Sequence, residues 1–326
     1  MKAILCREFG TPERLEYADV EPLTPGAGQI VLSVKACAVN FPDTLIIQGK
    51  YQYQPSMPFS PGTDVAGVVK SVGAGVETLR PGARVFGLVM HGGYAEEVIM
   101  PAAAATLIPD EIDFVTAAAF QLTYGTAYHA LVDRARIQPG ETLLVLGAAG
   151  GVGLAAVEVG KTLGARVIAA ASSPEKLAAC REAGADEVID YSVENLRERL
   201  KTLGGDTGVN VAFDPVGGSF TEPALRSMAW GGRYLVIGFT SGDIPRIPLN
   251  LPLLKVCALV GVFYGSLLAH DPALARTNQR ELVAWLREGR IKPRVSATYP
   301  LRDAALALND ITARRAVGKI VLVMEG

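Results

Sequence analysis

The sequence predicts an α/β protein in which a doubly wound parallel sheet is combined with an antiparallel β-barrel. Three observations support this prediction. Between residues 142 and 264, β-forming runs alternate with segments of helical periodicity. Over the first 120 residues, short β-like runs are separated instead by proline and glycine. A last β-like run, residues 319–324, closes the chain and needs a sheet to join.

The N-terminal region has the pattern of a compact barrel with tight turns. Residues 29–36, 65–72 and 84–89 are short and rich in β-formers. Turn residues punctuate them: Pro25, Gly26, Pro61, Gly62, Gly73, Gly75, Pro81 and Gly82. After helices at 282–288 and 303–309, the closing strand at 319–324 is expected to return to this barrel. The first domain would then be discontinuous.

A glycine-dense turn at residues 147–153 is the most informative motif. It follows a β-like run and leads directly into an apolar helical pattern, which is the layout of the first βα unit of a dinucleotide-binding fold. A glycine at 150 lets backbone approach a pyrophosphate, and the new helix N-terminus offers free N–H groups. Because Ala148 replaces the usual first glycine, the turn alone is a weak signal. The expected pyrophosphate contacts are Ala149, Gly150, Gly151 and Val152.

The following hundred residues strengthen this prediction. Further strands are expected at residues 166–171, 187–191, 209–214, 233–238 and 258–264, and helices at 174–183, 193–203 and about 222–228. Strands that alternate with helices in this way favour a parallel Rossmann sheet.

The end of the second strand indicates NADPH as the cofactor. An NAD site usually places an acidic residue there to hold the ribose 2′-hydroxyl. Here residues 170–173 are alanine and serine, and the first acidic residue after the strand is Glu175. Ser172 leaves room for a 2′-phosphate, and Lys176 lies one helical turn away to pair with it. The alternative for Lys176 is a solvated helix residue without a ligand.

Composition narrows the class of partner. The net charge is −2 and no basic cluster is present, which argues against nucleic acid and anionic lipid. The N-terminus has no signal-peptide pattern, and the longest apolar run, residues 256–269, is too short to span a bilayer. The four cysteines are scattered with no C-x-x-C pair. We therefore expect a cytoplasmic protein with free thiols.

The chain resembles the zinc-free quinone oxidoreductase branch of the medium-chain dehydrogenase/reductase superfamily, which is related to ζ-crystallin. Its quinone-oxidoreductase-like subgroup is the most similar. The resemblance covers the whole chain and is carried by residues 39–43 (VNFPD), 61–69 (PGTDVAGVV), 81–85 (PGARV), 147–153 (GAAGGVG), 213–218 (FDPVGG) and 314–322, which end in GKIVL. It implies a GroES-like barrel as the catalytic domain. The expected boundaries are 1–122 for the first part of that domain, 123–265 for the NADP-binding Rossmann domain, and 266–326 for the return.

Departures from the zinc alcohol dehydrogenases argue against a metal. Those enzymes need an early cysteine and a Gly-His-Glu after the barrel turn. Here the second motif reads Gly62-Thr63-Asp64, and Cys37 has no neighbouring histidine. A four-cysteine lobe is also missing between about residues 85 and 115. A tetrahedral zinc site therefore cannot be assembled convincingly from these residues.

The resemblance implies that Asn40, Asp43 and Tyr51 lie at the nicotinamide and substrate end of the cleft. Asn40 would orient the carboxamide or ribose, and Asp43 would orient rather than titrate. Tyr51 would donate to the developing oxyanion or relay a proton. An aromatic loop residue that caps the barrel is an equally good interpretation of Tyr51, and Tyr53 is a rival for its role. In some relatives water supplies the proton.

Further cofactor contacts follow from the resemblance. Thr126 is expected near the nicotinamide ribose and Tyr191 beside the adenosine phosphate. Lys319 would reach a cofactor phosphate, or else be a strand-edge lysine. The remaining expected contacts follow strands four, five and six, where ligands bind in open α/β sheets: Val216, Gly238, Phe239, Thr240, Phe263 and Tyr264.

Without a Lewis acid, the substrate must accept hydride readily. The sequence therefore predicts an NADPH-dependent reductase of a quinone or another α,β-unsaturated carbonyl. A reductase of enoyl-thioesters or haloacrylates is the first alternative, since it shares the chemistry. A cofactor-binding protein with little turnover is the second. The apolar run at residues 258–264 could pair across a two-fold axis, which predicts a homodimer.

Overall fold

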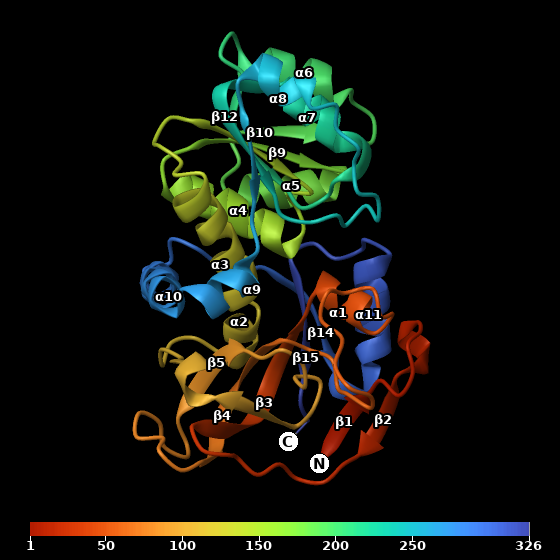
Figure 1. Cartoon of the computed structure of the whole chain (residues 1–326), viewed down its shortest axis with the longest axis vertical. Coiled ribbons are helices and arrows are strands. Elements are labelled where there is room, and N and C mark those ends of the chain that lie inside the picture. Colours follow the sequence, from red (N-terminus) through yellow and green to blue (C-terminus); the bar gives the residue numbers. More distant parts are fainter. Residues whose placement is uncertain (326) are drawn as a thin grey trace. The chain divides into compact units, whose positions relative to one another are not determined.

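The computed structural model describes residues 1–325, which divide into two compact units (Figure 1). Unit 1 is Met1–Leu122 together with the segment that begins at Pro293, and unit 2 is Thr123–Lys292. Unit 1 is therefore discontinuous, as the closing strand predicted. In the described part of the chain, no helix has the length and apolar character needed to cross a bilayer.

Unit 2 is built on a six-stranded parallel sheet with the order β10-β9-β8-β11-β12-β13. The strands are β8 (Thr142–Leu146), β9 (Arg166–Ala171), β10 (Glu187–Asp190), β11 (Val209–Asp214), β12 (Met228–Val236) and β13 (Ala258–Gly261). The strand order reverses between β8 and β11, and ligands bind at such a switch point, at the carboxyl ends of the strands. The Rossmann fold is confirmed.

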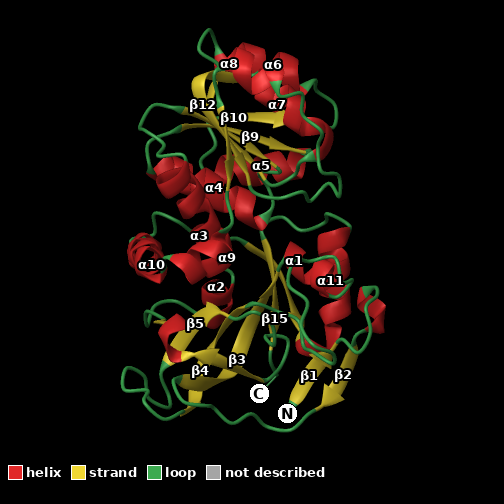
Figure 2. Ribbon diagram, viewed as in Figure 1, coloured by secondary structure: helices red, strands yellow, loops and turns green. Residues whose placement is uncertain are grey.

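Helices cover both faces of this sheet (Figure 2). Apolar residues of α6, α7 and α8 form one core cluster with β8, β9 and β11. The helical segments of this part of the chain are α3 (Gln121–Tyr128), η3 (His129–Arg134), α4 (Gly151–Thr162), α5 (Pro174–Glu182), α6 (Leu196–Gly204), η4 (Gly218–Phe220), α7 (Thr221–Arg226), α8 (Asn250–Lys255), α9 (Tyr264–His270) and α10 (Pro272–Arg287).

Several boundaries in unit 2 differ from the sequence prediction, and β12, expected at residues 233–238, is Met228–Val236. The helix expected from residue 193 begins at Leu196, because the Asn195 side chain accepts the Glu198 N–H and caps it there. The sixth strand, expected to reach residue 264, ends at Gly261. Phe263 is instead the N-cap of α9, so the apolar run is divided between a strand and a helix.

The chain returns to unit 1 at residue 293, later than the predicted boundary at 266. The predicted helix at 282–288 is the end of a longer helix, α10, which belongs to unit 2. Tyr128 donates to Glu281 at 2.7 Å, and the Asn278 amide donates to Asp133 at 2.7 Å. Side-chain contacts between residues far apart in sequence hold α10 in unit 2. The local sequence pattern carries no information about such contacts, so it could not predict this boundary.

Both ends of unit 2 are tied to a single carboxylate on α4. Glu158 Oε2 accepts from the Tyr124 hydroxyl at 2.7 Å and from the Lys292 N–H at 2.8 Å. Tyr124 is the second residue of unit 2 and Lys292 is its last. Burial raises the pKa of Glu158.

Unit 1 contains a seven-stranded sheet with the order β14-β15-β3-β4-β5-β7, and β6 also pairs with β3. All pairs are antiparallel except β14 with β15. The closing strand does join the barrel, since Ile320 pairs with Val39 and Leu322 with Cys37. The strands are β3 (Gln29–Val39), β4 (Asp64–Val72), β5 (Arg84–Leu88), β6 (Glu97–Pro101), β7 (Ala105–Leu107), β14 (Val295–Pro300) and β15 (Lys319–Val323).

Short helices and a small hairpin complete unit 1. The hairpin is β1 (Lys2–Leu5) with β2 (Glu16–Asp19). The helices are α1 (Phe41–Ile46), α2 (Phe114–Ala118), α11 (Ala304–Thr312), η1 (Pro12–Arg14), η2 (Ala102–Ala104) and η5 (Leu301–Asp303). Residues from β3, β4, β15 and α11 share one apolar core, which gives the barrel its own hydrophobic interior.

Two of the glycines in the βα turn, Gly150 and Gly153, should respond differently to valine. A Cβ at Gly153 would lie 2.4 Å from the Gly147 carbonyl oxygen, whereas at Gly150 it would meet that atom at 3.5 Å, an ordinary contact. We therefore expect Gly150→Val to fold, with a stability loss of about 1 kcal/mol at the N-cap, and to lose NADPH affinity at least about tenfold. Gly153→Val should fail to fold stably. Thermal melting and NADPH titration test both, and normal NADPH binding by Gly150→Val would contradict the assignment.

Candidate functional site

The N-terminus of α4 fits a dinucleotide pyrophosphate. Gly150 is its N-cap, in extended conformation and without a side-chain cap. The first N–H groups of a helix have no partner within the helix, and a Cβ at Gly150 would meet only the Gly147 carbonyl oxygen within 4 Å, which leaves room for a ligand to approach them. Ala149, Gly151 and Val152 adjoin this point, so the expected pyrophosphate contacts belong to one continuous turn.

Ser172 and Lys176 meet at the carboxyl end of β9, where the sequence predicted a 2′-phosphate site. The Lys176 ammonium donates to Ser172 Oγ at 3.1 Å. Tyr191 lies just beyond the neighbouring strand β10, and its N–H donates to the Ala171 carbonyl at 3.1 Å. One cation and two hydroxyl-bearing side chains therefore occupy adjacent strand ends. This set matches the hydrogen-bonding and charge requirements of a phosphate.

Asp214, at the end of β11, organises the next pair of loops. Its buried carboxylate accepts from the N–H groups of Val216 and Gly217, both at 2.8 Å. It also accepts from the hydroxyls of Thr221 at 2.9 Å and Tyr234 at 2.5 Å. Four donors fix this turn, so the position of Val216 is set by a residue that the sequence analysis quoted only as part of a motif.

The loop after β12 is attached to the same turn. Thr240 N donates to the Pro215 carbonyl and Ser241 N to the Val216 carbonyl, both at 3.0 Å. Gly238 and Phe239 lie between these contacts and the strand. The structure therefore brings together Val216, Gly238, Phe239 and Thr240 at the carboxyl edge of the sheet, as the resemblance implied.

The two aromatic residues after β13 differ in environment. Tyr264 is buried, and its ring lies so close to Gly125 that a Cβ there would be 2.3 Å from it. Phe263 is 58% exposed. Tyr264 therefore positions α3, which carries Thr126, whereas Phe263 keeps its ring available at the surface of unit 2. Phe263 is the more accessible of the two, and the cofactor contact expected of each stays a prediction.

In unit 1, a buried network surrounds Asn40. The Lys319 ammonium donates to Asn40 Oδ1 and lies 3.9 Å from Asp64 Oδ2. Both Lys319 and Asp64 are at most 4% exposed. Burial raises the pKa of Asp64 to about 7, against the opposing effect of Lys319, and burial lowers the pKa of Lys319. A fixed cation therefore sits beside the amide that the sequence assigned to cofactor orientation.

Asp43 belongs to the same network. It accepts from the Asn40 N–H at 2.8 Å, which completes a capping box at the start of α1, and from the Tyr94 hydroxyl at 3.1 Å. Burial raises its pKa to about 6, although these hydrogen bonds oppose the shift. Its contacts fix the start of α1, and the orienting role expected of it stays a prediction. Burial, and to a smaller extent the charge of Asp43, raise the pKa of Tyr51.

Lys319 departs from both interpretations of the sequence. It is not a strand-edge lysine, because β15 lies between β14 and β3 and the side chain is buried. Contact with a cofactor phosphate has no support either, because the ammonium is bonded to Asn40 inside unit 1. We reassign Lys319 as the residue that fixes the orientation of the Asn40 amide.

The donor set of this network does not match zinc. Thr63 and Asp64 occupy the positions of the Gly-His-Glu motif, and Asp64 faces the Lys319 ammonium. Cys37 is buried, and desolvation raises its thiol pKa well above the usual value. Across residues 1–325, three or more His, Cys, Asp or Glu side chains are nowhere grouped as a metal site would require. The sequence analysis did not predict that Asp64 and Tyr94 belong to this network, nor that Lys319 bonds to Asn40. The 61–69 motif, which contains Asp64, was the one signal for any of these contacts.

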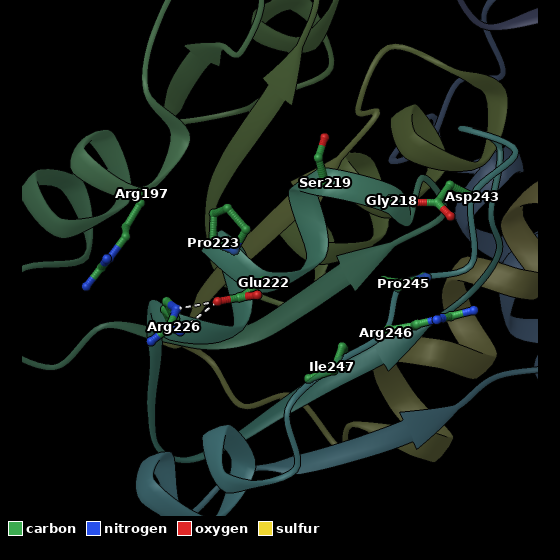
Figure 3. A pocket seen from close by; sticks show the side chains of 10 residues that line it. All are labelled: Arg197, Gly218, Ser219, Glu222, Pro223, Arg226, Asp243, Pro245, Arg246 and Ile247. Carbon is green, nitrogen blue, oxygen red and sulfur yellow. Dashed lines mark hydrogen bonds and ion pairs between the residues drawn. The ribbon is translucent and has the colours of Figure 1, made fainter.

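A pocket of about 480 Å³ in unit 2 lies between α6, α7 and the loop after β12 (Figure 3). The Arg226 guanidinium pairs with Glu222 at 2.6 Å, while Arg197 and Arg246 point away from each other. None of the predicted site residues lines it. Because its polar groups do not converge on one point, we do not assign it a ligand.

Comparisons with known proteins agree with these features. Residues 26–110 match the alcohol dehydrogenase GroES-like domain, and residues 151–284 match the zinc-binding dehydrogenase domain. The chain is 40% identical over 325 residues to quinone oxidoreductase-like protein 2 homolog of Nematostella vectensis, covering 98% of this chain and 88% of the relative. It is 32% identical over 327 residues to quinone oxidoreductase of Homo sapiens, covering 99% and 98%.

Solved structures show the same relationship. The crystal structure of Escherichia coli quinone oxidoreductase complexed with NADPH superposes with a TM-score of 0.93 at 32% identity. The match covers 99% of this chain and 100% of that one. A probable oxidoreductase from Mycobacterium abscessus gives a TM-score of 0.89 at 36% identity, with 99% and 98% covered.

Lys176 should set the preference for NADPH. A charge-assisted hydrogen bond to the 2′-phosphate is worth roughly 1.5–3 kcal/mol, so Lys176→Ala should weaken NADPH binding about 10–100-fold. NADH lacks this phosphate, and its dissociation constant should barely change. Titration of both cofactors against both proteins measures the difference. Equal losses would show that Lys176 acts on the fold, and a wild type that prefers NADH would contradict the assignment to NADPH.

Proposed function

The chain belongs to the quinone oxidoreductases of the medium-chain dehydrogenase/reductase superfamily, and on that premise we propose that it reduces a quinone or another α,β-unsaturated carbonyl without a metal. NADPH is the reductant. The observation that carries the metal-free proposal is the Lys319 ammonium, which occupies the buried network beside Asp64 and Asn40. In this chain, the cation of the buried network is the Lys319 side chain and not a metal ion.

When bound, NADPH supplies a hydride to the acceptor. The N-terminus of α4 would hold the pyrophosphate, and Ser172, Lys176 and Tyr191 would hold the 2′-phosphate. In unit 1, Lys319 donates to Asn40 Oδ1, and Asn40 Nδ2 donates to the Ala38 carbonyl at 3.3 Å, so the amide is held for its expected role of orienting the nicotinamide carboxamide or ribose. The Tyr51 hydroxyl would stabilise the charge that develops on the carbonyl oxygen. Asp43 would fix the backbone of Asn40 at the start of α1.

We further propose a homodimer that forms through the outer edge of β13. This strand ends the sheet of unit 2, carries no charge and is largely exposed. Exposed apolar side chains adjoin it on β12 and α8: Trp230 is 81% exposed, Leu253 73% and Leu254 70%. Uncharged strand edges and apolar patches of this kind are usually covered in stable proteins. A second copy, paired β13 to β13 across a two-fold axis, would cover both.

Leu259→Lys should convert this dimer to a monomer, because it places like charges opposite each other near the axis. Val193→Lys is the matched control: Val193 is 81% exposed but follows β10, at the other end of the sheet. Light scattering after size-exclusion chromatography at micromolar concentration reads the mass. A monomeric wild type, or a dimer that survives Leu259→Lys, would refute the interface.

The remaining assignments are a small-molecule substrate, no nucleic-acid or membrane partner, and a cytoplasmic location. The net charge of −2 supports the exclusion of polyanions. Cys6, Cys37, Cys180 and Cys257 are all free, which suits a reducing compartment.

The purified protein should oxidise NADPH in the presence of quinones or 2-alkenals, and chelators should not reduce the rate. The reason is that hydride acceptors of this class need no Lewis acid. A panel of quinones, 2-alkenals and enoyl-CoA esters, with metal analysis of the same sample, tests the proposal. A preference for enoyl-CoA would favour the thioester alternative, and absence of turnover would favour a binding protein. Zinc at unit occupancy would contradict the metal-free mechanism.

A further inference from the structure

His91 is a titratable residue for which the proposed function has no role. It lies in the loop after β5, which backbone hydrogen bonds hold firmly in place. Gly92 N donates to the Ser60 carbonyl at 2.7 Å and Gly93 N to the Gly62 carbonyl at 3.0 Å. Just before His91, Val89 N donates to the Thr63 carbonyl at 2.8 Å. The imidazole is therefore fixed beside the segment that leads into Asp64.

The ring is oriented by two aromatic neighbours. Nδ1 lies 3.1 Å from the Tyr53 hydroxyl oxygen, and the two ring centroids are 5.9 Å apart. Phe59 meets the imidazole edge-on, with centroids 6.3 Å apart and planes at 86°. Within residues 1–325, Nε2 makes no hydrogen bond. One nitrogen is thus committed to Tyr53, and the other has no hydrogen-bond partner among the described residues.

This pair adjoins the expected catalytic residues. Tyr94, three residues after His91, donates to Asp43. Tyr51, two residues before Tyr53, lies close enough to Asp43 for that carboxylate to raise its pKa. Tyr53 and Tyr51 both pack on the same core of unit 1. Tyr53 and His91 therefore lie in unit 1, each within three residues in sequence of a tyrosine that interacts with Asp43.

We propose that Tyr53 and His91 form a proton relay that completes the reduction of the acceptor, an inference that rests on the proposed function. Hydride transfer from the reduced nicotinamide leaves negative charge on the acceptor oxygen. The Tyr53 O–H bond breaks as an O–H bond forms on that oxygen. The Nδ1–H of a protonated His91 then restores the Tyr53 proton, which leaves a neutral imidazole with its proton on Nε2, and a hydronium ion from solvent returns a proton to Nδ1. The relay consumes one proton per hydride, which balances the reaction.

The relay has a defined pH dependence. Tyr53 is the titratable group that faces the ring, and Phe59 on its other side carries no charge. Burial lowers the pKa of His91 below its ordinary value of 6.5. The proton-donating form is therefore lost as pH rises through a pKa below 6.5, and proton delivery should slow over that range.

Tyr53→Phe and His91→Gln test the relay, and His270→Gln is the control. His270 is an exposed histidine of unit 2 that contacts Ser266. At saturating NADPH and quinone, each relay variant should lower kcat about 100-fold, within the usual range for general acid catalysis. The double variant should lose no more than either single one, because the two residues act in series. NADPH affinity and melting temperature should stay unchanged, and His270→Gln should behave as wild type.

Two readouts separate a relay from a structural role. The decline of kcat with rising pH should be present in wild type and absent from His91→Gln. The loss in both variants should also shrink for halogenated quinones, whose hydroquinone anions are less basic and depend less on an acid. Equal losses for all acceptors with an unchanged pH profile would overturn the relay, as would variants with wild-type kcat. A wild type that fails to reduce any quinone would instead overturn the proposed function.

Discussion

The buried charge balance around Lys319 is the constraint on which unit 1 depends. An ammonium at 4% exposure is tolerable only with anionic and polar partners. Asp64 on β4 and Asn40 at the start of α1 supply them, and Asp43 and Tyr94 complete the network. Removal of one member would leave the others buried and uncompensated. The last strand of the chain, the first helix and the middle of the barrel are therefore held together by electrostatics as well as by apolar packing.

Unit 2 solves a similar problem with a single anion. Asp214 is 3% exposed, but four donors surround it: two backbone N–H groups and two hydroxyls. No counter-cation is needed when a carboxylate is fully hydrogen-bonded. The Asp214 carboxylate and the Lys319 network have different roles. Asp214 gives rigid loop geometry to the carboxyl edge of the sheet, whereas the Lys319 network keeps a charge next to an amide that is expected to meet the cofactor. Rigid loops and a fixed amide suit a reaction that depends on the orientation of two bound molecules.

Much of the fold was predictable from local pattern. The strands Arg166–Ala171 and Val209–Asp214 have the bounds that their uninterrupted β-forming runs predict. The glycine turn and the Ser172–Lys176 pair were also accessible, because their residues lie within one βα unit. The rest depends on distance in sequence. Lys319 and Asn40 are 279 residues apart, and Tyr128 and Glu281 are 153 apart. No window of sequence contains both members of either pair, so the role of Lys319 and the late return of the chain could not be predicted.

The contacts of Glu158 bear on how such a protein can be rearranged. Because the entry and exit of unit 2 converge on one carboxylate, unit 2 has the form of an insertion whose two ends are anchored together. Domains with adjacent ends are the ones that tolerate transfer into new hosts and circular permutation. Residues 123–292 therefore form a cassette: a short linker from residue 122 to residue 293 would leave the barrel with a closed chain. In the same way, residues 123–292 could be exchanged between relatives as one piece, because Glu158 and both of its donors, Tyr124 and Lys292, lie within it.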